Sequence, residues 1–146
     1  MSRARDDEGS ALVEVVWLGV LLVLPLLWIV VAIGEVQAGA FGTTAAARSA
    51  GRAYVLAPDD GTGLVAAREA ARQALADQGM PQAPLDLSVT CAPDVGSCHA
   101  GGAVVTVRVA SRVALPLMPD LFGSGRPSFD LDATHTVPVG RYREVG

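Results

Sequence analysis

The sequence predicts an α+β chain, with a long N-terminal transmembrane helix followed by a small domain in which one helix packs on a three-stranded antiparallel sheet. Three patterns indicate this. An apolar stretch fills residues 11–33, a helical pattern of apolar residues follows a turn at Pro58, and from Leu85 onward apolar and polar residues alternate. We expect residues 1–9 to form a hydrophilic leader, 10–57 a transmembrane helix with an extracytoplasmic extension, and 58–146 the small domain.

The apolar stretch Ala11–Ile33 is long enough to cross a membrane. As a helix it spans roughly 34 Å, against a hydrocarbon core of about 30 Å. Arg3 and Arg5 precede it, and the next basic residue is Arg48. The positive-inside rule therefore predicts an N-terminus inside and a C-terminal domain outside.

A secretory signal peptide is the alternative interpretation, because the small residues Ala38-Gly39-Ala40 could form a cleavage site. The apolar stretch is longer than the usual ~7–15 residues of a signal peptide. It is also preceded by acidic residues 6–8 and contains the carboxylate of Glu14. These three features favour a membrane helix.

Glu14 requires an explanation, because a charged group in lipid costs a few kcal/mol or more and marks a functional position. If the chain is cut after Gly9, Ser10 becomes the first residue and Glu14 the fifth. The Glu14 carboxylate could then pair with the α-amino group of a neighbouring subunit and fix the axial register of parallel helices. An ordinary anchor helix that tolerates Glu14 near the interface is the simpler alternative.

Gly9 followed by Ser10-Ala11-Leu12-Val13-Glu14 resembles the processing site of type IV pilin-like proteins. With Pro25 in the helix and the stretch Ala45-Ala46-Ala47-Arg48-Ser49-Ala50-Gly51-Arg52, the chain resembles the TadE/TadG-like minor pseudopilins of tight-adherence (Flp) pili. The resemblance implies a small β-rich domain with paired cysteines, and cleavage between Gly9 and Ser10 by a prepilin peptidase. It implies as partners the membrane, the peptidase, other pilin-like subunits and pilus assembly proteins. It also implies a place in the bacterial cytoplasmic membrane, with extraction into a pilus as a further step.

Small residues recur every four positions beyond the apolar stretch and form a nearly straight line along a helix. They are Gly34, Ala38, Gly42, Ala46 and Ala50. Such a stripe lets helix backbones approach closely, so we expect it to pack against another helix of this chain or of a partner. An alanine-rich composition without a packing role is the alternative.

The second helix is expected over Thr62–Gln78, ending at Gly79 and Pro81. Its apolar face is predicted to comprise Leu64, Val65, Ala71, Ala74 and Leu75. Three strands are expected over 85–91, 105–115 and 129–139, where apolar residues occupy every second position.

Cys91 and Cys98 are the only cysteines, and we expect a disulfide that closes the loop between the first two strands. A metal site formed by both cysteines with His99 and His135 is the alternative, although the spacing differs from close-paired zinc motifs. The sequence predicts no metal and no cofactor.

No catalytic constellation is predicted. Asp130 and Asp132 share a strand face as solvated carboxylates, and Gly123-Ser124-Gly125 lacks the strand–turn–helix context of a nucleophile elbow. The formal charge of −4 gives no reason to expect nucleic acid as a partner. The apolar segment Leu115–Phe122 is a candidate binding surface, or folds back on the sheet or the membrane. An uncleaved, membrane-tethered binding module of the cell envelope is thus the alternative to a pseudopilin.

Overall fold

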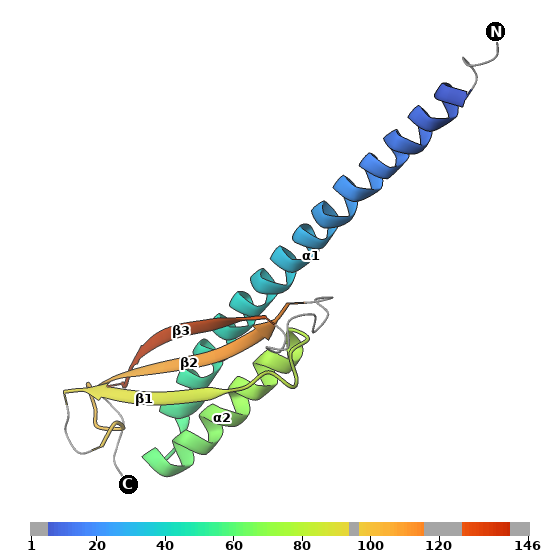
Figure 1. Cartoon of the computed structure of the whole chain (residues 1–146). Coiled ribbons are helices and arrows are strands. Elements are labelled where there is room, and N and C mark those ends of the chain that lie inside the picture. The colour runs from blue at the N-terminus through green and yellow to red at the C-terminus, as the bar shows by residue number, and fades with distance from the viewer. Residues whose placement is uncertain (1–5, 94–96, 116–126, 141–146) are drawn as a thin grey trace. The chain divides into compact units, whose positions relative to one another are not determined.

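The computed structural model describes residues 6–93, 97–115 and 127–140, with side chains from Ala11 onward. Along the chain, the elements are α1 (Asp6–Leu56), α2 (Asp60–Asp77), β1 (Asp86–Ala92), β2 (Val104–Ala114) and β3 (Ser128–Pro138) (Figure 1). The predicted α+β class is confirmed: a long apolar N-terminal helix, a second helix and a three-stranded antiparallel sheet. The chain forms two units, Met1–Gly34 and Glu35–Gly146.

The first unit contains the apolar half of α1, which continues as a helix through Pro25. Apart from Trp28, its large apolar side chains from Leu12 to Ile33 are 46% to 69% exposed. Within the part of the chain that the structure describes, α1 is the one helix long and apolar enough to cross a membrane. So much exposed apolar surface is unfavourable in water, which is consistent with a single-pass membrane anchor.

The second unit is built around a sheet with the strand order β1-β2-β3 (Figure 1). Both pairs are antiparallel, with Val107 opposite Val89 on one side and His135 on the other. Alternation dictates the faces: every second residue of β2 is buried, and Val105, Val107 and Val109 have no exposed surface. The other face of β2 carries polar side chains such as Arg108 and Arg112 in solvent.

Both helices of this unit contribute to the core against one face of the sheet. The core contains residues of α1, α2, β1 and β2, with Ala103 and Val139 from the adjoining loops: Ala46, Ala47, Ala50, Tyr54, Ala67, Ala71, Ala74, Leu75, Leu87, Ala103, Val105, Val107, Val109 and Val139. The sequence predicts one covering helix, whereas the structure has two, because the C-terminal part of α1 packs here as well. The second compact unit begins at Glu35 and therefore includes this part of α1.

α2 begins at Asp59, whose side chain accepts a hydrogen bond from the Thr62 amide as an N-cap. Its buried residues are all small except one: Gly63, Ala67, Ala71, Ala74 and Leu75. The expectation that Val65 faces the core is wrong, because its side chain is 64% exposed. The buried side of α2 is lined with glycine and alanine, which allow close packing, and Val65 lies on the opposite side of the helix.

Phe129 also departs from the predicted inward row, since its side chain is 48% exposed. It lies at the second position of β3, opposite Val113 near the end of β2. At that end β2 continues past the first residue of β1, Asp86, which pairs with Ala110. The sheet is therefore two strands wide around Phe129, and less of it is available to bury the ring.

Candidate functional site

Glu14 lies exposed on the apolar half of α1. Within the described residues, its carboxylate has no hydrogen-bond or ion-pair partner. α1 begins at Asp6, so the predicted cleavage position between Gly9 and Ser10 lies within helical backbone. The structure thus leaves the Glu14 carboxylate available on a surface that is otherwise apolar from Ala11 to Ile33.

The small-residue stripe divides into two parts. Gly34 is exposed, and a Cβ added there would meet nothing within 4 Å. Ala38 is half-buried, whereas Gly42, Ala46 and Ala50 are buried in the second unit. The C-terminal part of the stripe therefore packs inside this chain.

Glycines of α1 mark where the helix approaches its neighbours. A Cβ at Gly42 would overlap the end of the Met80 side chain, and one at Gly51 would lie 3.1 Å from Val137 Cγ2. A Cβ at Gly39 would overlap Val113. These close approaches account for glycine in a helix interior, where each glycine otherwise costs about 1 kcal/mol relative to alanine.

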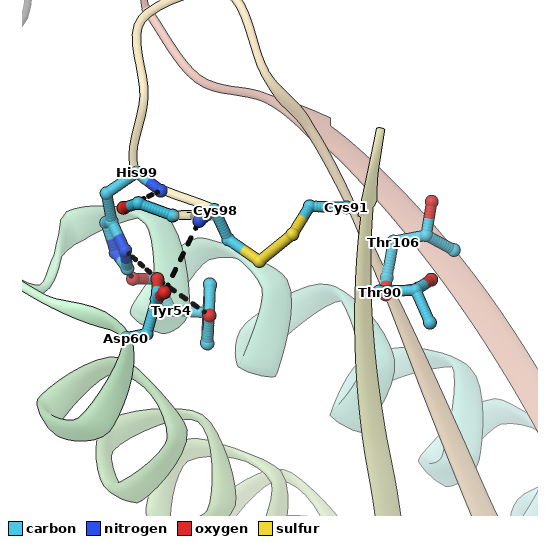
Figure 2. The surroundings of a disulfide bond; sticks show 8 residues. Tyr54, Asp60, Thr90, Cys91, Cys98, His99 and Thr106 are labelled. Carbon is cyan, nitrogen blue, oxygen red and sulfur yellow. Dashed lines mark hydrogen bonds and ion pairs between the residues drawn. A yellow bond between two sulfur atoms is a disulfide. The ribbon is translucent and has the colours of Figure 1, made fainter. Parts of the chain in front are cut away.

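The cysteines form the predicted disulfide. Cys91 at the end of β1 is bonded to Cys98 in the loop before β2, with the two Cα atoms 5.5 Å apart (Figure 2). The alternative metal site would need both sulfur atoms as ligands, and here they are bonded to each other. Across the described part of the chain, no group of three or more histidine, cysteine, aspartate or glutamate side chains is arranged to hold a metal ion.

A polar cluster that is buried at His99 and Tyr54 and open to solvent at Asp60 lies beside this disulfide (Figure 2). The His99 side chain is 7% exposed, and its Nδ1 lies 2.6 Å from Asp60 Oδ1. Its Nε2 lies 2.9 Å from the backbone oxygen of Tyr54. The Tyr54 ring stacks on the imidazole with the ring centroids 5.0 Å apart. The Asp60 carboxylate also accepts hydrogen bonds from the Tyr54 hydroxyl and, at 3.4 Å, from the Cys98 amide.

This cluster shifts two titrations. Burial, together with the hydrogen bond and the negative charge of Asp60, raises the pKa of Tyr54 to about 12. Burial opposes ionisation of Asp60, but hydrogen bonds from His99, the Cys98 amide and the Tyr54 hydroxyl outweigh it and hold the pKa of this carboxyl below 3.8. Asp60 is therefore a carboxylate at neutral pH.

The acidic pair Asp130 and Asp132 lies on the solvent face of the sheet. Asp130 pairs with Arg112, and Asp132 with Arg108 at 3.5 Å, each across the β2–β3 ladder. Exposed pairs of this kind contribute about 0–1 kcal/mol and are common on sheet surfaces. The segment Gly123-Ser124-Gly125 and most of the apolar segment Leu115–Phe122 lie outside the described residues.

Sequence reasoning missed the cluster of Tyr54, Asp60 and His99, since it considered His99 only as a ligand of the alternative metal site. His135, the other histidine of that alternative site, is half-buried on β3 near Gly51. The ion pairs, the N-cap of α2 and the disulfide described above all join residues within the second unit. Comparison with models of known protein families, with curated proteins and with solved structures finds no match for this chain.

Proposed function

We propose that this chain is a TadE-like minor pseudopilin that takes part in the assembly or structure of a tight-adherence pilus. One observation carries the proposal: Glu14, five positions after Gly9, is the one charged residue within the apolar stretch Ala11–Ile33. In the structure it is exposed on a helix whose other side chains in this stretch are apolar. A carboxylate in that position is costly in lipid unless it acquires a partner.

Cleavage after Gly9 would create that partner. The new α-amino group at Ser10 is largely protonated near neutral pH. In an assembly of parallel helices, the Glu14 carboxylate of one subunit pairs with this ammonium group on its neighbour. Loss of either member would leave an unpaired charge away from water, so the pair favours one axial register over others.

The proposed topology places the N-terminus in the cytoplasm and the second unit outside the bacterial cytoplasmic membrane. The arginines at positions 3 and 5 support it, because no further basic residue occurs before Arg48. The Cys91–Cys98 bond supports it independently, since disulfides persist in oxidising compartments. In this arrangement the second unit, which forms the head of the protein, contacts other pilin-like subunits and pilus assembly proteins.

The proposal is tested by replacing Glu14 in cells that assemble the pilus. Glu14→Ala and Glu14→Gln should leave insertion into the membrane fraction intact and abolish co-purification with other pilus subunits. Glu35→Ala is the matched control, because Glu35 is an exposed glutamate on the same helix just beyond the apolar stretch. Normal co-purification of both Glu14 variants would remove the role proposed for this carboxylate.

Intact-mass measurement of the protein from its native membrane distinguishes the alternatives. A mature chain that begins at Ser10 is the expected result and requires a prepilin peptidase. A chain that retains Met1 would instead indicate the uncleaved, membrane-tethered binding module. A chain that begins near Phe41 would indicate a secreted domain released by signal peptidase, and either of these results would contradict the pseudopilin proposal.

A further inference from the structure

The surroundings of His99 determine which form of its side chain the fold accommodates. Nδ1 faces a carboxylate oxygen of Asp60, and Nε2 faces the backbone oxygen of Tyr54 (Figure 2). A backbone oxygen can only accept a hydrogen bond, and an ionised carboxylate can only accept as well. Both ring nitrogens are therefore satisfied together only when both carry hydrogen, which is the imidazolium form.

The Asp60 carboxylate, whose side chain is 43% exposed, accepts hydrogen bonds from three groups of the protein. Asp60 Oδ1 receives the Tyr54 hydroxyl at 3.1 Å in addition to the His99 ring, and Oδ2 receives the Cys98 amide at 3.4 Å. These donors favour the ionised carboxylate, so Asp60 supplies a negative charge to the buried ring. A buried cation that is paired and hydrogen-bonded in this way avoids most of the penalty of burial.

The end of α1 favours the same form. Tyr54 lies in the last turn of α1, which ends at Leu56, and the final carbonyls of a helix carry partial negative charge. A cation at that position donates a second hydrogen bond to the Tyr54 carbonyl, which also accepts the Ala57 amide at 3.2 Å, and it interacts favourably with the helix dipole. Asp59, whose carboxylate also attracts His99, adds a further negative charge at the start of α2. Among the described groups, Asp59, Asp60 and the Tyr54 hydroxyl are thus the titratable groups that face or attract the ring.

We infer that His99 is a proton-operated latch, in which the imidazolium fastens the loop between β1 and β2 to the turn between α1 and α2. While the ring is protonated, it bridges the C-terminus of α1 and the first residue of α2. When the ring loses a proton, one nitrogen presents a lone pair to an acceptor and a buried hydrogen bond is lost. Cys98 and His99 then detach from the helices, while the Cys91–Cys98 bond keeps Cys98 attached to β1.

The latch depends on the charge of both side chains. It requires an ionised Asp60, whose pKa lies below 3.8, and a protonated His99. The stability that the ionised Asp60 contributes is complete above the pKa of this carboxyl in the unfolded chain. It is lost as the pH falls through the lower pKa of the folded state. The latch lies within the second unit, whether or not the chain is part of a pilus.

Direct observation of the ring provides the first test. The full chain in detergent micelles is labelled with ¹⁵N-histidine, and His135→Gln separates the signals of the two histidines. At pH 7, where an exposed histidine side chain is largely neutral, both ring nitrogens of His99 should show the chemical shifts of protonated nitrogens. A non-protonated nitrogen on His99 at pH 7 would overturn the inference, and this measurement on the folded protein does not depend on a variant at position 99.

The second test measures release of the loop. The amide of Cys98 donates to Asp60, so its protection from hydrogen exchange reports whether the latch is closed. In His99→Gln the protection factor at pH 7 should fall by about tenfold or more, since a charge-assisted hydrogen bond is lost. The matched control His135→Gln should keep the wild-type value. An unchanged protection factor in His99→Gln, or an equal loss in His135→Gln, would contradict a latch at His99.

Discussion

Removal of the Cys91–Cys98 bond should destabilise the second unit without changing its fold. The bond joins residues separated by 7 positions, so it closes a short ring in the unfolded chain. For a ring of about eight residues, the chain-entropy relation gives a stabilisation of about 2.5 kcal/mol at 25 °C. Cys91 and Cys98 are also partly buried against the core, so their replacement by serine adds a smaller cost of exposing or burying polar groups.

The expected effect is large relative to the total stability of a small domain, which is about 5–15 kcal/mol. With a urea dependence of about 1–3 kcal/mol per molar, the unfolding midpoint should fall by about 1–2 M. The full chain carrying Cys91→Ser and Cys98→Ser is compared with the wild type by proteolysis after brief exposure to graded urea. Proteolysis detects unfolding of the head while the apolar helix remains in its micelle.

A reducing agent provides the control. It should lower the midpoint of the wild type to that of the double variant and leave the double variant unchanged. Equal midpoints for oxidised wild type and double variant would refute the reasoning, because the ring would then place no constraint on the unfolded chain. A midpoint of the variant far below that of the reduced wild type would show that lost packing of the sulfur atoms, and not the ring, dominates the effect.

Two further results are expected from the same urea and proteolysis measurement. Gly79 has a positive φ of 79° just after α2, so Gly79→Ala should lower the free energy of unfolding by about 1 kcal/mol. Gly79→Asn should lower it less, because asparagine tolerates this conformation. Equal losses of stability in the two variants would show that the backbone angle is not the cause. The pKa of Tyr54 is raised to about 12, so the folded state holds the phenolic proton more tightly than the unfolded state, and the stability from this proton is complete below pH 10 and lost as the pH rises towards 12. Tyr54→Phe should lack this alkaline loss, and an absorbance titration that shows no tyrosine ionising near pH 12 in the wild type would contradict it.

The fold could be predicted because each element carries a strong local pattern. The apolar stretch, the turn at Pro58 and the period-two alternation specify α1, α2 and the three strands, and β2 differs from its predicted range by one residue at each end. Prediction failed where a large apolar residue was assumed to face inward. Val65 and Phe129 are both exposed, because burial depends on which neighbours reach a position and not on the residue alone.

The polar cluster could not be predicted from the sequence. Asp60 and His99 are 39 positions apart, and no spacing rule connects them. They meet because Asp60 is the first residue of α2, at the end of the turn after α1, while the disulfide holds Cys98 beside β1. Only the fold brings these two points together. The sequence offers one indirect signal, which is that the histidine directly follows a cysteine expected to be bonded.

The small-residue stripe bears on how α1 can both pack within the second unit and be available for contacts between subunits. Gly42, Ala46 and Ala50 are buried within the head, and a surface covered in this way cannot also contact a neighbouring subunit while the head is folded. Helix-to-helix assembly, as proposed here, must then use side chains that this chain leaves exposed, among which Gly34 and the apolar residues before it remain. In that stretch the side chains are nearly all apolar, so contacts between them are similar at many axial offsets. In the proposed assembly, a single carboxylate at Glu14 would remove this ambiguity, because its pairing with a neighbour's α-amino group would be satisfied at one offset and unsatisfied at the others.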